Sequence, residues 1–86
     1  MASDRQNETR KLTVETSDSV ENFVTGCSGC YLVATADCYV AFDETADTGS
    51  LLIKANIVYP LENIKFTQIH ALQTGGASSL HILAFR

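Results

Sequence analysis

The chain lacks most of the features that mark secreted, disulfide-stabilised or membrane-bound proteins. It has no Trp, one Pro and three Cys in 86 residues, so its cysteines cannot all pair in disulfides. No segment approaches the roughly 20 apolar residues that a membrane span requires. No apolar leader follows the N-terminus. We therefore expect a protein made in the cytoplasm, with reduced cysteines and without a membrane partner.

Basic residues are also scarce. Lys and Arg number 6 against 10 Asp and Glu, which gives a net charge of −4 and an isoelectric point near 4.9. Nucleic-acid binding requires a basic face, so we do not expect nucleic acid as a partner. The sequence also contains no nucleophile elbow and no phosphate-binding Gly-rich loop. These absences predict a non-enzymatic protein without a cofactor.

The residues that are present predict one small globular domain. Hydrophobic residues make up 45% of the chain and charged residues 19%, which is typical of folded proteins. A chain of this length buries roughly 60–65% of the surface that its unfolded form exposes. Its core is therefore marginal, and a partner that covers more apolar surface would stabilise it.

Hydrophobic patterning predicts strands. Apolar residues alternate with polar ones or form short runs, and turn-forming residues lie between them. A capping-box spacing at 18–24 is compatible with one helical turn, and a change of phase at 67–68 predicts a bulge. The fold class that we predict is all-β, a small antiparallel β-sandwich or barrel of about six strands. These strands are expected at 12–15, 30–35, 38–42, 51–59, 64–72 and 80–85.

Residues 1–11 are predicted to form an extended polar arm that precedes a single domain at 12–86. The arm carries three basic and two acidic residues, a net charge of +1, whereas the domain carries three basic and eight acidic residues, a net charge of −5. A basic arm could therefore lie on the acidic domain of a neighbouring copy.

The order of motifs after residue 30 resembles a known class of protein. A Tyr-Val-Ala-Phe-Asp run at 39–43 precedes a polar loop, an apolar strand at 51–59 and a Pro-Leu step at 60–61. Ile-His-Ala-Leu-Gln at 69–73, a Thr-Gly-Gly-Ala-Ser turn and Leu-His-Ile-Leu-Ala at 80–84 follow. This order resembles small β-sandwich virion proteins of tailed bacteriophages.

The resemblance implies a non-catalytic role in capsid decoration, in a head fibre, or in the neck or tail. It also implies assembly as a trimer or ring, with other virion proteins as further partners and the virion as the location. The Cys-x-x-Cys motif and the polar arm depart from the pattern of these proteins.

The three cysteines are the sharpest chemical motif. Cys27 and Cys30 have the spacing of a zinc knuckle, Cys38 follows eight residues later, and a His could complete the set. The alternative function is therefore a small zinc-stabilised binding module. A second knuckle is absent, however, and small buried apolar residues within strands explain the same cysteines. We therefore predict no metal, with the zinc module and a redox role as alternatives.

Two further groups of polar residues invite interpretation. His70 and His81 lie on strands joined by a short loop, so they would face each other if those strands pair. The loop at 43–50 and its surroundings are rich in Asp and Glu but lack the spacing of a calcium loop. We interpret the loop as a solvated acidic segment and the histidines as ordinary surface or interface residues.

Apolar residues on both faces of the predicted strands indicate an interface. In so small a domain only one face of a strand can meet the core, and an exposed apolar face usually marks a contact surface. Together with the arm, this predicts self-assembly. The candidate interface residues are Arg5, Arg10, Lys11, Leu52, Val58, Leu83 and Phe85.

Overall fold

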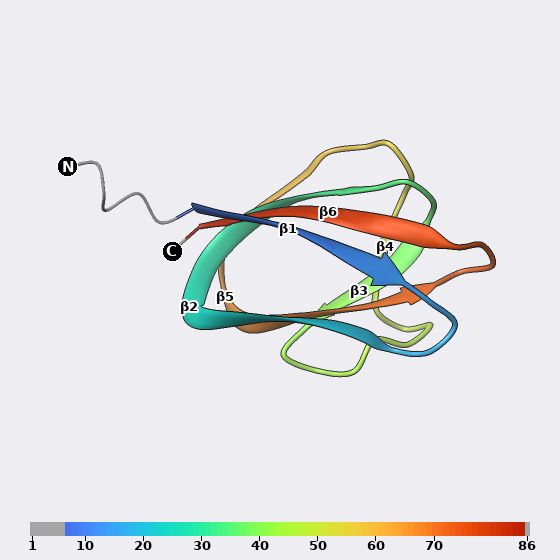
Figure 1. The fold of residues 1–86 in the computed structure, drawn as a ribbon, viewed down its shortest axis with the longest axis horizontal. Helices are drawn as coiled ribbons and strands as arrows, with labels where there is room; N and C mark the ends of the chain where they lie inside the picture. Colours follow the sequence, from blue (N-terminus) through green and yellow to red (C-terminus); the bar gives the residue numbers. More distant parts are fainter. Residues whose placement is uncertain (1–6, 86) are drawn as a thin grey trace.

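The computed structural model describes residues 7–85, and within this range the chain is all-β, as predicted. The described residues form six strands and no helix, and Figure 1 shows how these strands are arranged. The described residues thus contain no helix that could cross a membrane. The strands are β1 (Asn7–Val14), β2 (Ser19–Ala34), β3 (Cys38–Phe42), β4 (Leu51–Ile53), β5 (Tyr59–Gln73) and β6 (Ser78–Phe85).

The strands form one antiparallel sheet in the order β1-β6-β2-β5-β3-β4. Apart from β3 and β4, strands that are consecutive in the sequence are not neighbours in this sheet. The last strand, β6, lies between β1 and β2, and β2 lies between β6 and β5. Strands β5 and β6 are joined by a short loop but do not pair, so the hairpin that would bring His70 opposite His81 does not form.

Two long strands bend and fold the sheet over on itself (Figure 1). Strand β2 pairs with β5 at Ser19–Asn22 and again at 29–32, and the register shifts between these stretches. On the β5 side of the bend Asn63 has a φ of 61°, a left-handed conformation that Asn tolerates better than most residues. The bend therefore lies where both strands depart from regular pairing.

We call the parts of the sheet on the two sides of the bend the first and the second half-sheet. The first half-sheet contains β1, β6, residues 29–34 of β2 and residues 59–62 of β5. The second half-sheet contains β3, β4, residues 19–22 of β2 and residues 66–73 of β5. The inward faces of both half-sheets supply the core. The largest fully buried side chains are Leu32, Ile53, Ile69, Leu80, Ile82, Val14, Val40, Cys30 and Cys38.

Polar contacts connect the half-sheets along their open side. The guanidinium of Arg10 on β1 donates a hydrogen bond to the Glu21 carboxylate on β2 at 2.7 Å. The backbone N–H of Gln73, where β5 ends, donates to the carbonyl of Glu15, just after β1, at 3.1 Å. These contacts hold the edge strand β1 against the second half-sheet.

Several local predictions were wrong around the bend. Residues 18–24 form no helical turn: β2 begins at Ser19, and Val20 pairs with His70. The strand predicted at 30–35 is only the second part of β2, which begins at Ser19 and includes the Gly-containing segment at 25–29. The register shift opposite 67–68 is real, yet the extra residues lie on β2. The long-range pairing gives these backbone groups partners that local propensity does not anticipate.

The predicted strand at 51–59 was also wrong. Strand β4 ends at Ile53, and Asn56 has a φ of 61°, which breaks the extended conformation. The carboxylate of Asp37 accepts a hydrogen bond from the N–H of Ala55 at 2.8 Å and so replaces a strand partner. Pro60 does not end a strand: it lies near the start of β5, where a missing N–H is tolerated.

The boundary of the polar arm differs as well. The arm was predicted to end at residue 11, whereas β1 starts at Asn7 and pairs with β6 throughout its length. Residues 7–11 are therefore part of the sheet. The rest of the predicted arm, including Arg5, lies outside the range that the structure describes.

Candidate interaction surface

The outward face of the first half-sheet carries several apolar side chains. The inward residues of β6 are buried, so the residues between them point outward. Leu83 is paired with Thr9 on one side and with Tyr31 on the other, and Tyr31 is in turn paired with Pro60. Because residues directly opposite each other in an antiparallel sheet point to the same side, these residues share the outward face. We call it the outer face.

An aromatic pair stands on this face. The rings of Tyr31 and Phe85 meet edge to face with centroids 5.6 Å apart. Phe85 lies against Gly29, where an added Cβ would be 2.6 Å from Phe85 Cε2 and 2.9 Å from the Leu61 carbonyl oxygen. Gly29 is thus required for the close approach of the ring. Tyr31 still leaves 39% of its surface exposed, so the pair is available to a partner.

The predicted interface residues separate into groups. Leu83, Phe85 and Lys11 lie on the outer face. Val58, 60% exposed, directly precedes β5 at the border of that face. Leu52 is exposed on β4, opposite Tyr39 in the second half-sheet, and therefore belongs to another surface.

Sequence reasoning missed Tyr31 and Pro60, which lie on the outer face. Residues 30–35 are apolar at most positions, so the pattern did not show which residues face outward. The pairing of Tyr31 with Leu83, a residue that was predicted, assigns Tyr31 to the face.

Arg10, also predicted at the interface, makes its contacts within the chain. Its guanidinium forms ion pairs with Glu21 at 2.7 Å and Glu8 at 3.0 Å, and it lies 5.1 Å from the centroid of the Phe23 ring. Hydrogen bonds to Glu21 and Glu8 raise the pKa of Arg10. Arg10 therefore points toward the second half-sheet, away from the outer face, and helps to close the open side of the fold.

The cysteines do not gather into a metal site. Cys27, Cys30 and Cys38 are free thiols and all three are buried. Between residues 7 and 85, no group of three or more His, Cys, Asp and Glu side chains is placed to hold a metal ion. Burial raises the pKa of Cys30 to about 12 and that of Cys38 to about 11. These two thiols therefore remain protonated at neutral pH, as small apolar core residues.

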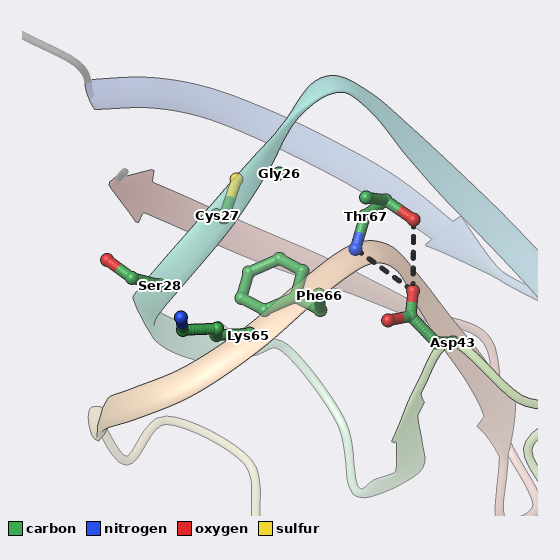
Figure 2. Close-up of a pocket in the computed structure, with 7 residues that line it drawn as sticks. All are labelled: Gly26, Cys27, Ser28, Asp43, Lys65, Phe66 and Thr67. Atoms are coloured by element: carbon green, nitrogen blue, oxygen red, sulfur yellow. Dashed lines mark hydrogen bonds between the residues drawn. The ribbon is translucent and has the colours of Figure 1, made fainter.

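A hollow of about 420 Å³ lies over the bend (Figure 2). The one carboxylate in its lining, that of Asp43, accepts hydrogen bonds from the N–H of Thr67 at 2.9 Å and from that of Gln68 at 2.8 Å. These bonds lower the pKa of Asp43. The carboxylate thus supports the irregular backbone of β5. The lining residues are Gly26, Cys27, Ser28, Asp43, Lys65, Phe66 and Thr67.

His70 is part of a polar cluster in the second half-sheet. Its Nδ1 lies 2.8 Å from Asp18 Oδ2, and its Nε2 lies 2.9 Å from Gln68 Oε1. The second oxygen of Asp18 accepts a hydrogen bond from the N–H of Ala46, in the loop at 43–50, at 2.8 Å. His81 lies in the first half-sheet, opposite Lys11. His70 therefore attaches a loop to the sheet and does not face the other histidine.

Two acidic residues of the loop at 43–50 have defined hydrogen-bond partners within the chain. Asp43 binds the backbone of β5, and Asp47 accepts a hydrogen bond from the N–H of Gly49 at 2.8 Å. The solvated loop that we predicted is therefore more ordered than its composition suggested. Its carboxylates replace backbone partners where strands end.

Comparison with known proteins gave no match: no family model fits the chain, and no curated protein or solved structure is significantly similar to it. The resemblance to phage virion proteins therefore remains a prediction, drawn from the order of motifs after residue 30.

Proposed function

We propose that this chain is a non-enzymatic structural protein that assembles with copies of itself in the virion of a tailed bacteriophage. The observation that carries the proposal is the outer face, where Tyr31, Leu83, Phe85 and Pro60 form an apolar surface on a domain of 86 residues. Exposed apolar surface of this kind usually marks a contact between proteins. The virion setting comes from the resemblance in sequence.

The energetics favour assembly. Burial of apolar surface contributes roughly 25 cal/mol per Å², and a domain this small has little stability of its own to draw on. Covering the outer face with a second copy adds core-like packing without lengthening the chain. The interior thiols and the hollow over the bend supply no comparable arrangement for catalysis.

Self-assembly is tested by light scattering coupled to size-exclusion chromatography. We expect the wild-type protein to elute as an oligomer and Tyr31→Lys to elute as a monomer with an unchanged far-UV circular dichroism spectrum. Leu51→Lys is the matched control, because Leu51 is 48% exposed but lies on β4 in the second half-sheet. A monomeric wild-type protein at every concentration tested would contradict the proposal.

The virion setting is tested separately. Mass spectrometry of phage particles purified from the host that makes this protein is expected to detect the chain in many copies per particle. Its absence from particles, when it is abundant in the same lysate, would contradict the virion role and leave self-assembly to be judged by chromatography.

A further inference from the structure

We infer that two copies of this chain pair through their outer faces about a two-fold axis, with Lys11 of each copy against Glu62 of the other. This inference rests on the proposed function and deepens it, because it names the partner, the contact residues and the symmetry. It departs from the trimer or ring that the sequence resemblance implies. A single self-complementary face closes with two copies.

The register of the first half-sheet arranges the outer face in rows. The middle row is Thr9, Leu83, Tyr31 and Pro60, read from β1 across β6 and β2 to β5. Lys11 lies on β1, two residues from Thr9. Glu62 lies on β5, two residues from Pro60. The pairing of Lys11 with His81 and of Glu62 with Gly29 places these charges in the rows on either side of the middle one.

The two charges therefore occupy opposite corners of the apolar face. They are separated by three strand spacings, about 14 Å, across the sheet and by four residues, about 13 Å, along it. The midpoint of the line between them falls between Leu83 and Tyr31, in the middle of the apolar row. One basic and one acidic corner thus flank a central apolar pair.

Both corner residues are available to a partner. Lys11 and Glu62 are exposed. Within the part of the chain that the structure describes, neither takes part in an ion pair. Arg10 and Lys54 have carboxylate partners inside the chain, whereas Lys65, in the lining of the hollow over the bend, takes part in no ion pair among the described residues. Lys11 and Glu62 therefore retain charges that a second copy can neutralise.

Two-fold symmetry matches these corners to each other. A two-fold axis that lies in the plane of the face, passes between Leu83 and Tyr31 and runs perpendicular to the Lys11–Glu62 line exchanges the two corners. Each copy then places Lys11 over Glu62 of the other, and the apolar centres meet. A head-to-head match of Lys11 with Lys11 would oppose like charges, which costs affinity.

The same axis fixes how the sheets cross. The line between the corners runs at about 45° to the strands, because its two components are nearly equal. The axis is perpendicular to that line and also runs at about 45°, so the strands of the two copies cross at about 90°. This is the orthogonal mode of sheet packing, in which inner faces still interdigitate. The complex is thus a second sandwich built between two copies.

Charge reversal tests the arrangement with sedimentation equilibrium of the intact chain. Lys11→Glu and Glu62→Lys each oppose like charges at both symmetry-related contacts, and we expect each to weaken dimerisation by about tenfold or more. The double variant Lys11→Glu/Glu62→Lys restores both ion pairs, so its dissociation constant is expected within about threefold of wild type. Glu44→Lys is the control, since Glu44 is exposed in the loop at 43–50.

The outcomes separate this inference from the function on which it rests. Suppose that the wild-type protein is an oligomer and the Tyr31→Lys variant a monomer, but that the double variant dimerises as weakly as the single variants. The Lys11–Glu62 pairing is then wrong, and self-assembly through the outer face stands. An oligomer of three subunits likewise overturns the two-fold arrangement alone. A wild-type protein that stays monomeric overturns both proposals.

Discussion

The outward faces of the two half-sheets differ in how far the chain's own loops cover them. In the second half-sheet, His70 and Ala41 point outward but are 8% and 5% exposed. The loop at 43–50 is attached there through the hydrogen bond between Ala46 and Asp18. Among the described residues, 7–85, no such loop covers Tyr31 in the first half-sheet, and this side chain stays 39% exposed. The chain thus covers the part of the second face around His70 and Ala41 with its own residues, whereas Val20 and Leu52 on the same face stay 37% and 38% exposed.

A chain of this length has few residues with which to cover the faces of its sheet. Covering the part of the second face around His70 uses eight loop residues and a polar attachment, Asp18 to His70, in addition to the buried side chain of Ala46. Covering the first face in the same way would require further segments. Association of two copies covers both first faces with residues that are already in strands, which is an economical solution for a domain with little surface to bury.

The largest effect is expected where both half-sheets share the core. Ile69→Ala removes a fully buried side chain from the inward face of the second half-sheet, so we expect a loss of about 2–5 kcal/mol in the free energy of unfolding. Urea denaturation measures it. Leu83→Ala, on the outer face, is the comparison. We expect it to weaken self-association, and to lower the free energy of unfolding of a single copy by less than Ile69→Ala does. An equal loss of stability in both variants would contradict the difference between inner and outer faces.

The next effect concerns the covered face. Asp18→Ala removes the acceptor of the Ala46 N–H and the partner of His70 Nδ1. Leaving these buried groups without a partner is expected to cost about 1–3 kcal/mol. Hydrogen exchange is expected to speed up at Ala46, with little change in β6. Glu44→Ala, in the same loop, serves as the control, and unchanged exchange at Ala46 in the Asp18 variant would argue against the attachment.

A comparable effect is expected at the uncovered face. Gly29→Ala places a methyl group 2.6 Å from Phe85 Cε2 and 2.9 Å from a backbone oxygen, so the ring must move. We expect a loss of roughly 1–3 kcal/mol from overpacking together with weaker self-association. Gly75→Ala is the matched control, because nothing lies within 4 Å of the Cβ position there. Equal stability of the two variants would show that Phe85 does not rest on Gly29.

The smallest effect is a dependence on pH at the bend. Hydrogen bonds from the Thr67 and Gln68 amides lower the pKa of Asp43 below its ordinary value of 3.8. A lowered pKa in the folded state stabilises the fold above the unfolded pKa, and the contribution is lost as the pH falls through the folded value. Asp43→Asn is therefore expected to flatten the fall in stability below about pH 4. Acid titration at fixed urea measures it, with Asp47→Asn as the control.

The sequence predicted the class of fold because alternation is a local signal. In β6, Leu80, Ile82 and Ala84 are buried at every second position, as the pattern at 80–85 indicated. The partners of that strand were not predictable in the same way. Alternation says which side chains face inward but not which strand lies alongside, and the insertion of β2 between β5 and β6 depends on contacts far apart in the chain.

The errors in the middle of the chain have a related cause. Residues 51–59 alternate well enough for one strand, yet Asn56 adopts a left-handed conformation and Asp37 binds the N–H of Ala55. A side chain 18 residues away thus overrides the local pattern. For the outer face, Leu83 and Phe85 were predicted from their own strand, whereas Tyr31 required knowledge of the β2–β6 register.

The position of β6, between the edge strand β1 and β2, also constrains how the chain acquires its fold. Strand β1 pairs with β6, and β6 joins it to the rest of the sheet. The first strand therefore stays without its ladder partner until residues 78–85 are available. Such non-local pairing makes folding slow and leaves edges exposed meanwhile. In a nascent chain that ends at residue 77, the neighbouring strands β2, β5, β3 and β4 are all present, whereas β1 still lacks the strand with which it pairs. Synthesis of the last strand therefore determines when β1 can join the sheet.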